Sequence, residues 1–258
     1  MQKKSSKATS KPARFAEIDI LRGAAVILMI VFHAAYNLNF FGLTEITTDR
    51  GIWLLMARFV QLTFIITTGL TLHISYQRRL SAGKVTALIS RIKHAAKIFA
   101  WAMLITLVTW LLFRADAVIF GVLHFYAIAL LLGLPFLRKG PRALYATLIL
   151  GLAIIILSPL TSAITTDSNL LSPLGIYKAN FQSLDYFPLI PWFGWFLLGI
   201  SMGKIFYPGG ERKSTKITVP RALKGKILKF LGRHSLIIYL VHQPIIALAI
   251  LCYRYYIM

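Results

Sequence analysis

The chain has 258 residues, of which 57% are hydrophobic and only 14% charged, and its mean hydropathy is +0.70. Soluble domains are about half apolar and about a quarter charged, so this composition excludes an ordinary soluble domain and favours a membrane protein. The formal net charge of +21 would suggest nucleic-acid binding in a soluble chain, but no basic domain stands apart from the apolar runs, and we expect no nucleic-acid partner.

The chain opens with a basic segment, residues 1–16, which we interpret as a disordered cytoplasmic tail. The apolar run that follows, at about 18–40, is too long for the hydrophobic part of a signal peptide and contains Asp19, Arg22 and His33. We therefore interpret it as a retained first transmembrane helix. Since no later polar stretch is long enough for a second domain, residues 17–258 are predicted to form one transmembrane domain.

A helix crosses a bilayer in about 20 apolar residues, and seven segments of the chain meet this requirement. In chain order they are 18–40, 52–76, 95–113, 117–137, 143–163, 187–206 and 235–256. Each is expected to be helical, because backbone in contact with lipid must satisfy its own hydrogen bonds. The predicted fold is all-α, a polytopic transmembrane helix bundle of about seven spans.

Lysine and arginine are divided unevenly between two sets of connections. Of the 29 basic residues, 22 lie in the N-terminal tail and around the connections after the second, fourth and sixth segments, whereas four lie in the other connections or at the C-terminal end. Cytoplasmic loops carry the excess of Lys and Arg, so the N-terminus is predicted in the cytoplasm and the C-terminus outside. We expect a multi-pass protein of the cell (plasma or inner) membrane, surrounded by the lipid bilayer.

The first span carries a polar stripe, and ionisable side chains inside a bilayer mark candidate functional sites. His33 follows Arg22 by eleven residues, about three turns plus 20°, so the two share a helix face about 16 Å apart in depth. Asp19 lies one turn before Arg22 and can pair with it, and Tyr36 and Asn37 extend the stripe outward. The alternative is a packing stripe with an interfacial ion pair. For His33 we favour proton transfer, because histidine titrates near neutrality.

Two further spans carry polar groups at a similar depth. Arg58 and Gln61 lie one turn apart in the second span, and His124 lies in the fourth. Counted from the outer boundary at about 1.5 Å per residue, His33, Arg58 and His124 are all about 9–10 Å deep. A small bundle has one interior, so we expect the three groups to face it together. The alternatives are a hydrogen-bonded core histidine for His124 and a water-filled vestibule for Arg58.

Three later features complete the set of polar candidates. Asp185 stands at the outer mouth of the sixth span, where it can orient a histidine, receive a polar acceptor or cap a helix. The long outer loop 164–186 contains a patch, 170–181, that is interpreted as an interfacial helix or a lid. In the last span His242 and Gln243 precede a helix-kinking proline and are expected nearer the cytoplasmic side. No three histidines or carboxylates have close metal-ligand spacing, so no metal is expected.

Four stretches of the sequence carry a family resemblance. They are Glu17-Ile18-Asp19-Ile20-Leu21-Arg22-Gly23 followed by His33, Phe120-Gly121-Val122-Leu123-His124-Phe125, Leu184-Asp185-Tyr186-Phe187-Pro188-Leu189-Ile190-Pro191-Trp192-Phe193-Gly194 and Leu231-Gly232-Arg233-His234-Ser235-Leu236. In this order they resemble bacterial and archaeal proteins grouped with the catalytic domain of heparan-α-glucosaminide N-acetyltransferase, over about residues 17–250. The spacing of Arg22 and His33 is also similar to that of type-3 membrane acyltransferases.

The resemblance implies an enzyme that moves an acetyl or other acyl group from acetyl-CoA, or another acyl-CoA, on the cytoplasmic side. The acceptor would be the amine or hydroxyl of a glycan or amino sugar at the outer side. The lysosomal enzyme has a histidine associated with catalysis in the loop after its first span, and the corresponding loop 41–51 has none here. We therefore predict His33 first and His124 second as the catalytic histidine, with Arg58 and Asp185 as further catalytic residues.

The remaining polar residues of the spans are predicted to bind substrate. They are Asp19, Arg22, Tyr36, Asn37, Gln61, His242 and Gln243. The alternative function is a proton- or anion-coupled membrane transporter, because intramembrane His and Arg also line ion pathways. Such transporters often contain internal repeats, and none is visible here. A homodimer is a further possibility, on which no feature of the sequence bears.

Overall fold

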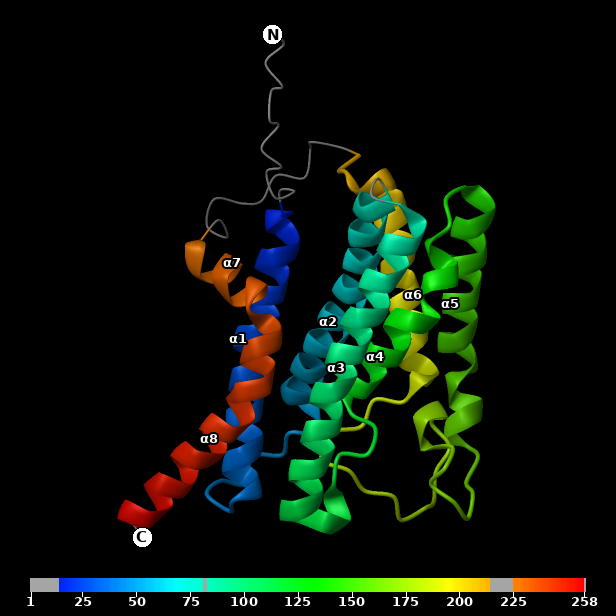
Figure 1. The fold of residues 1–258 in the computed structure, drawn as a ribbon. Coiled ribbons are helices and arrows are strands. Elements are labelled where there is room, and N and C mark those ends of the chain that lie inside the picture. Colours follow the sequence, from blue (N-terminus) through cyan, green and yellow to red (C-terminus); the bar gives the residue numbers. More distant parts are fainter. Residues whose placement is uncertain (1–13, 81–82, 214–224, 258) are drawn as a thin grey trace. The chain divides into compact units, whose positions relative to one another are not determined.

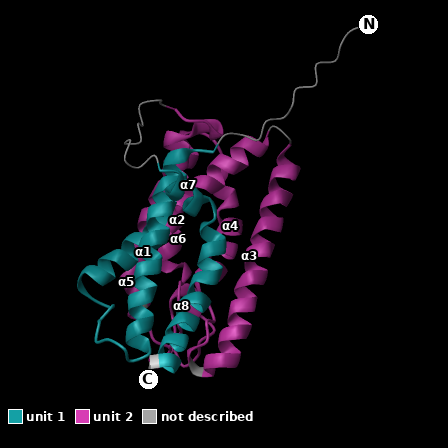
Figure 2. Cartoon of the chain, turned by 90° about the vertical axis from the view of Figure 1, so that its left-hand side faces the viewer, with its two compact units in different colours: residues 1–63, 218–258 teal, residues 64–217 magenta. Residues whose placement is uncertain are grey.

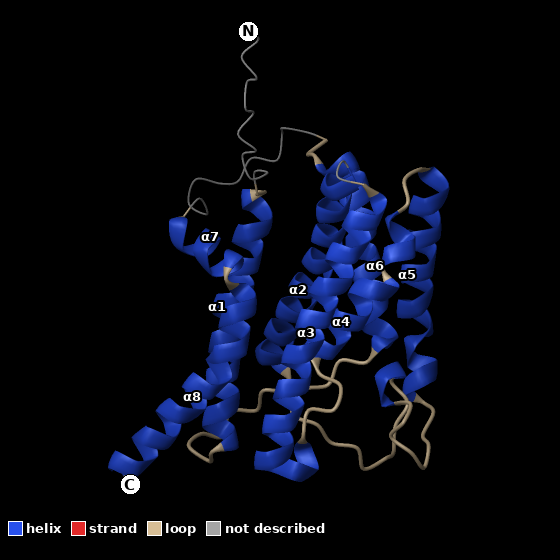
Figure 3. Cartoon of the chain, viewed as in Figure 1, coloured by secondary structure: helices blue, strands red, loops and turns tan. Residues whose placement is uncertain are grey.

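Residues 14–80, 83–213 and 225–257 are described by a computed structural model in which every regular element is a helix (Figures 1 and 3). The α-helices are α1 (Ala16–Phe40), α2 (Gly51–Arg79), α3 (Lys84–Phe113), α4 (Val122–Leu132), α5 (Pro141–Ser162), α6 (Leu189–Phe206), α7 (Lys226–Arg233) and α8 (Ser235–Ile257). Short 3-10 turns are η2 (Arg114–Asp116), η3 (Leu134–Leu137), η4 (Ser172–Leu174) and η5 (Pro208–Gly210). The predicted all-α fold is confirmed, and most of the predicted basic tail lies outside the described residues.

Six of these helices are long and apolar enough to cross a membrane, namely α1, α2, α3, α5, α6 and α8. The remaining predicted span, 117–137, contains the shorter apolar helix α4, which ends before Gly133 and continues as the turn η3 around Pro135. Helix α3 begins eleven residues before the predicted start of its span, at Lys84. Hydropathy marks the part of a helix that lies in hydrocarbon, so a helix that projects beyond the membrane is predicted too short.

The chain divides into two compact units, coloured separately in Figure 2. Unit 1 comprises residues 1–63 and 218–258, and unit 2 comprises residues 64–217. The boundary falls inside α2, so the outer part of that helix belongs to unit 1 and the rest to unit 2. The prediction of one transmembrane domain over residues 17–258 stays a prediction.

Unit 1 is built on a very close approach between α1 and α7. A side chain at Gly23 would collide with the backbone of Leu228, and one at Gly232 would collide with the backbone of Asp19. Glycine at both positions therefore lets the two helix backbones touch, as small residues do in membrane helix pairs. Helix α8 begins two residues after α7 ends. The contact between α7 and α1 therefore determines the level of α1 at which α8 begins.

Helices α1 and α8 run in the same direction within unit 1 (Figure 1). His33 of α1 contacts His242 of α8, and Asn37, one turn further along α1, contacts the next residue, Gln243, so residue numbers rise together along both helices. If two helices cross the membrane in the same direction, the number of spans from the first to the second, with both included, must be odd. The six long helices make an even number, so this geometry favours counting α4 with η3 as a seventh span, which puts the two ends of the chain on opposite sides.

Unit 2 contains α3 to α6 and the inner part of α2. Phe125 from α4 and the α6 residues Phe196, Leu197 and Ile200 are fully buried and form its core. Glycines again permit close packing, since a side chain at Gly199 of α6 would meet the backbone of Ile66 in α2. The outer loop before α6 contains the 3-10 turn η4 and an isolated bridge between Thr165 and Tyr177, rather than the interfacial helix considered for 170–181.

Candidate functional site

Two residues of the polar stripe predicted on the first span, His33 and Asn37, contact polar side chains of α8. His33 of α1 lies beside His242 of α8, with 3.3 Å between His33 Nδ1 and His242 Nε2. The two ring centroids are 4.8 Å apart and the rings are inclined by 70°. His242 is buried and His33 is half-buried. Unit 1 thus places two histidines from opposite ends of the sequence in contact inside predicted spans.

Backbone carbonyls fix both rings. Nδ1 of His33 is 2.9 Å from the carbonyl oxygen of Met29, one turn earlier in α1. Nδ1 of His242 is 2.7 Å from the carbonyl oxygen of Tyr239. No hydrogen bond to Nε2 of His33 occurs among the described residues, so this nitrogen remains available to a substrate.

The position of His242 and Gln243 corrects one expectation. They were expected nearer the cytoplasmic side, but their partners in α1 are His33 and Asn37, in the outer half of the first span. The prediction assumed that the last span begins at the cytoplasmic membrane surface with Ser235, and it counted depth from there. In the structure α7 occupies the level of the first turns of α1, so α8 begins further along.

Asn37 continues the contact one turn beyond His33. Its Nδ2 donates to the side-chain oxygen Oε1 of Gln243 over 2.7 Å and to the carbonyl oxygen of His33 over 2.9 Å. Tyr36, the neighbouring residue of the stripe, is half-buried, and its ring stacks on that of Phe40 at 6.2 Å between centroids. Asn37 and Gln243, which the sequence predicts independently as site residues, are therefore hydrogen-bonded to each other.

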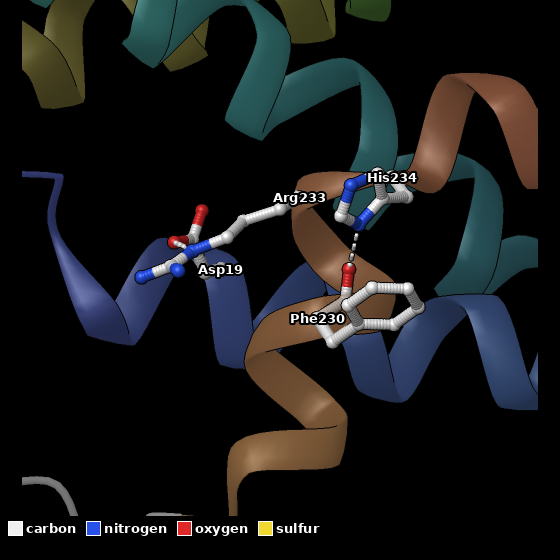
Figure 4. Close-up of polar contacts among 4 residues, drawn as sticks. All are labelled: Asp19, Phe230, Arg233 and His234. Carbon is white, nitrogen blue, oxygen red and sulfur yellow. Dashed lines mark hydrogen bonds and ion pairs between the residues drawn. The ribbon is translucent and has the colours of Figure 1, made fainter.

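At the other end of the stripe, the carboxylate of Asp19 accepts a hydrogen bond from Nε of Arg233 over 3.0 Å (Figure 4). The spacing along α1 predicts that Asp19 can pair with Arg22 on its own helix, and it does not indicate Arg233 as a partner. The two residues are separated by 214 positions, so no local spacing rule connects them. Beside this pair, Nδ1 of His234 lies 2.8 Å from the carbonyl oxygen of Phe230.

Arg58 and Gln61 form the pair that their spacing predicts. A guanidinium nitrogen of Arg58 donates to Oε1 of Gln61 over 3.1 Å, and Arg58 is exposed in the isolated chain. Both residues belong to the outer part of α2 in unit 1.

His124 belongs to unit 2, where it is buried in α4 between aromatic rings. The rings of Phe99 and Phe120 each lie 5.9 Å from its ring, and its Nε2 is 3.3 Å from the hydroxyl of Thr106. That hydroxyl donates to the carbonyl oxygen of Val118 over 2.6 Å. It must therefore accept from Nε2, which leaves Nδ1 of His124 unprotonated and, within the described residues, buried without a partner.

Asp185 fixes the start of the helix that carries His124. Its Oδ2 accepts a hydrogen bond from the backbone N–H of Val122, the first residue of α4, over 2.9 Å. The carboxylate approaches so closely that a Cβ on Gly121 would lie 3.0 Å from its carbon atom. Asp185 thus caps α4, whereas α6, at whose outer end it was predicted to lie, is preceded by Pro188 and has no side-chain cap. The other roles considered for Asp185 stay predictions.

The outer loop before α6 is held by aromatic contacts. The rings of Tyr177, Phe181 and Tyr186 lie 5.0–5.4 Å from one another, and the Tyr186 hydroxyl donates to the carbonyl oxygen of Ser172 over 2.7 Å. Burial raises the pKa of the Tyr186 hydroxyl, and the neighbouring Tyr177 adds to this shift. Tyr186 therefore acts as a neutral donor that fastens the loop.

The predicted site residues fall into two groups. Unit 1 contains Asp19, Arg22, His33, Tyr36, Asn37, Arg58, Gln61, His242 and Gln243, whereas unit 2 contains His124 and Asp185. The predicted shared depth of His33, Arg58 and His124 involves both units and stays a prediction. Arg233 and Thr106 are contacts that sequence reasoning missed. Within the parts of the chain that the structure describes, no group of three or more His, Cys, Asp or Glu side chains is placed to hold a metal ion.

A comparison with protein families identifies the chain. Residues 14–244 match the family model described as heparan-alpha-glucosaminide N-acetyltransferase, catalytic. The matched segment includes all of the predicted site residues up to His242 and Gln243. Neither the curated proteins nor the solved structures contain a match to the chain.

Proposed function

This chain belongs to the family of heparan-alpha-glucosaminide N-acetyltransferase catalytic domains, and from this we propose that it is an integral membrane acyltransferase that uses acetyl-CoA or another acyl-CoA. The acceptor is a glycan or amino sugar with a free amine or hydroxyl. The observation that carries this proposal is the family match over residues 14–244, which extends from the start of α1 to the His242 region of α8.

The two substrates approach from opposite sides of the cell membrane in this proposal. Acyl-CoA docks at the cytoplasmic face, where the positive-inside distribution gathers most basic residues. The acceptor enters from the outer side, toward which the polar stripe of α1 extends through Tyr36 and Asn37. A membrane-spanning arrangement of this kind lets a cytoplasmic metabolite modify an outer glycan without leaving the cell.

His33 is the proposed general base. Its Nε2 takes the proton of the acceptor amine or hydroxyl while that nucleophile forms a bond to the thioester carbonyl carbon. The tetrahedral intermediate collapses with cleavage of the carbon–sulfur bond, and the thiolate of coenzyme A leaves and takes up the proton from His33. In the alternative route, Nε2 itself accepts the acyl group and passes it to the acceptor in a second step.

The other residues have supporting roles in the proposal. Arg58, with Gln61 bonded to it, stabilises the negative charge on the carbonyl oxygen during transfer. Arg22 and Asp19 contact the donor nearer the cytoplasm, and Asn37 and Gln243 with Tyr36 receive the acceptor. His124, on the helix capped by Asp185, is the second candidate for the base.

The test is acyl transfer by purified protein in detergent. Radiolabelled acetyl-CoA is supplied with a panel of amino sugars and lipid-linked glycans, and wild type is compared with His33→Ala and with His234→Ala as a histidine control outside the proposed site. We expect transfer by the wild type and the control, and loss in His33→Ala that remains monodisperse. A general base contributes about 10²–10⁴-fold, so full activity in His33→Ala would rule out this role, and the absence of transfer by wild type would overturn the proposed function.

A further inference from the structure

The contact between His33 and His242 defines where the protons of both rings lie. A backbone carbonyl oxygen only accepts hydrogen bonds, and a neutral histidine has one donor and one acceptor nitrogen. Nδ1 of His242 lies 2.7 Å from the Tyr239 oxygen, so this nitrogen carries the proton. The other nitrogen of His242, Nε2, is then a hydrogen-bond acceptor, and it points at His33.

The same argument applies to His33. Its Nδ1 lies 2.9 Å from the Met29 oxygen and 3.3 Å from Nε2 of His242. Both neighbours are acceptors, so Nδ1 of His33 carries a proton that the two share. The lone pair of His33 is thereby assigned to Nε2, the nitrogen with no hydrogen bond from any described residue.

The opposite arrangement is unfavourable at two places. If His242 donated from Nε2, its Nδ1 lone pair would face the Tyr239 oxygen at 2.7 Å. Nδ1 of His33 would then be the acceptor, and its lone pair would face the Met29 oxygen at 2.9 Å. Each case sets two acceptors against each other at hydrogen-bond distance, which leaves buried polar atoms unsatisfied.

Because the proposal rests on the acyltransferase function above, it concerns the same site. We propose that His242 is a positioning residue that holds His33 with its proton on Nδ1, so that Nε2 is the base. When Nε2 takes the acceptor proton, the Nδ1–H of the resulting imidazolium makes a charge-assisted hydrogen bond to His242. This is the role that a third group plays for the histidine of a nucleophile–histidine–carboxylate triad, with a buried imidazole and a carbonyl in place of the carboxylate.

The surroundings keep His242 in register with His33. His242 is only 5% exposed, and the next residue, Gln243, is hydrogen-bonded to Asn37 over 2.7 Å. Asn37 also donates to the carbonyl oxygen of His33 itself. The bond between Asn37 and Gln243 therefore joins the same two helices as the histidine pair, one turn further along α1, and this resists sliding of α8 along α1.

The kinetic test compares two substitutions at one position. His242→Ala removes the acceptor, whereas His242→Gln returns an amide oxygen at a similar reach. We expect kcat to fall in His242→Ala by at least about tenfold, but by no more than the 10²–10⁴-fold that the base as a whole contributes, with KM for both substrates nearly unchanged. His242→Gln should recover most of the loss, and His242→Leu replaces His242→Ala if the latter is not monodisperse.

A spectroscopic test is independent of activity. Protonated and unprotonated ring nitrogens give separate ¹⁵N resonances, so protein with ¹⁵N-labelled histidine reports the tautomer, and His33→Ala identifies the His33 signals by difference. We expect His33 protonated at Nδ1 in wild type and a smaller share of this tautomer in His242→Ala, where only the Met29 carbonyl still accepts from Nδ1. His234→Ala is the control. It removes a histidine whose Nδ1 also lies near a carbonyl oxygen one turn back, and it should leave the His33 signals unchanged.

The outcomes separate this inference from the proposed function. If wild type is active while His242→Ala keeps its kcat, or His242→Gln is no better than His242→Ala, the positioning role is overturned. If His33 carries its proton on Nε2 in wild type, the role is overturned whatever the kinetics. If wild type transfers no acyl group, the proposed function falls together with the role of His242 in it, even where the tautomer is as expected.

Discussion

Replacing Gly232 with alanine tests the close contact on which unit 1 is built. Gly232 lies in α7 against α1, and a Cβ built on it would lie 2.7 Å from the carbonyl carbon of Asp19 and nearer still to its carbonyl oxygen. Ordinary Cβ contacts are 3.4–4 Å. Backbone atoms cannot turn aside as a side chain would, so the two helices must separate, and this also lengthens the 3.0 Å bond between Arg233 and Asp19.

Two opposing effects determine the magnitude. Alanine is more favourable than glycine inside a helix by about 1 kcal/mol. Overpacking a tight contact costs about 1–3 kcal/mol, and the overlap with backbone places Gly232→Ala at the upper end of that range. We expect a net loss of about 1–2 kcal/mol, which corresponds to a fall in apparent Tm of about 2–8 °C for a chain of this size.

The assay is thermal unfolding in detergent, followed by the fraction of monodisperse protein after heating. Lys226→Ala is the control in the same helix, because Lys226 is exposed and surface changes usually stay within about 0.5 kcal/mol. Gly23→Ala, whose Cβ would meet the backbone of Leu228 across the same contact, should behave like Gly232→Ala. A Gly232→Ala protein that is as stable as wild type, or more stable, would refute the reasoning.

Three further stability predictions use the same assay. Arg233→Ala leaves the buried carboxylate of Asp19 without its 3.0 Å partner, and because Arg233 is about half exposed we expect a loss of about 1–2 kcal/mol, between surface and buried ion pairs; an unchanged Tm would contradict this. Asn37→Leu and Gln243→Leu should each lose a 2.7 Å hydrogen bond, with a coupling of about 0.6 kcal/mol in a double-mutant cycle, and purely additive losses would show that the bond is absent. Asp185→Ala should lose about 0.5–2 kcal/mol with the cap on α4, whereas Asp185→Asn should retain most of it, and equal losses in both would exclude capping.

Hydropathy alone located the membrane-crossing helices because a bilayer imposes a length and a composition on each of them. At two points it did not predict the bounds of the helix, for different reasons. The first turns of α3, from Lys84, are polar enough to be read as a connection, although the helix is continuous. The segment 117–137 is apolar apart from His124, but Gly133 and Pro135 end the α-helix at Leu132, which hydropathy does not register.

Periodicity predicted which residues of α1 share a face, but it could not predict what that face contacts. Arg233 and His242 lie 214 and 209 positions from their partners Asp19 and His33, so no spacing rule connects them. The depth of His242 also depends on α7, whose packing against α1 sets where α8 begins. Counting residues from a presumed membrane surface ignores such a helix, and for this reason the sequence placed His242 too near the cytoplasm.

The position of His33 along α1 has a consequence for the proposed reaction. His33 lies 17 residues from the start of α1 and seven from its end, or about 26 Å and about 10 Å at 1.5 Å per residue. An acceptor that enters at the outer end therefore has a short path to Nε2. A donor that enters at the cytoplasmic end must extend past Arg22, about 16 Å before His33. The longer path is therefore that of acyl-CoA, which carries its acyl group on a long flexible arm. The short outer path thus suits the acceptor and the long cytoplasmic path suits the donor, in agreement with the sides that the distribution of basic loops predicts for them.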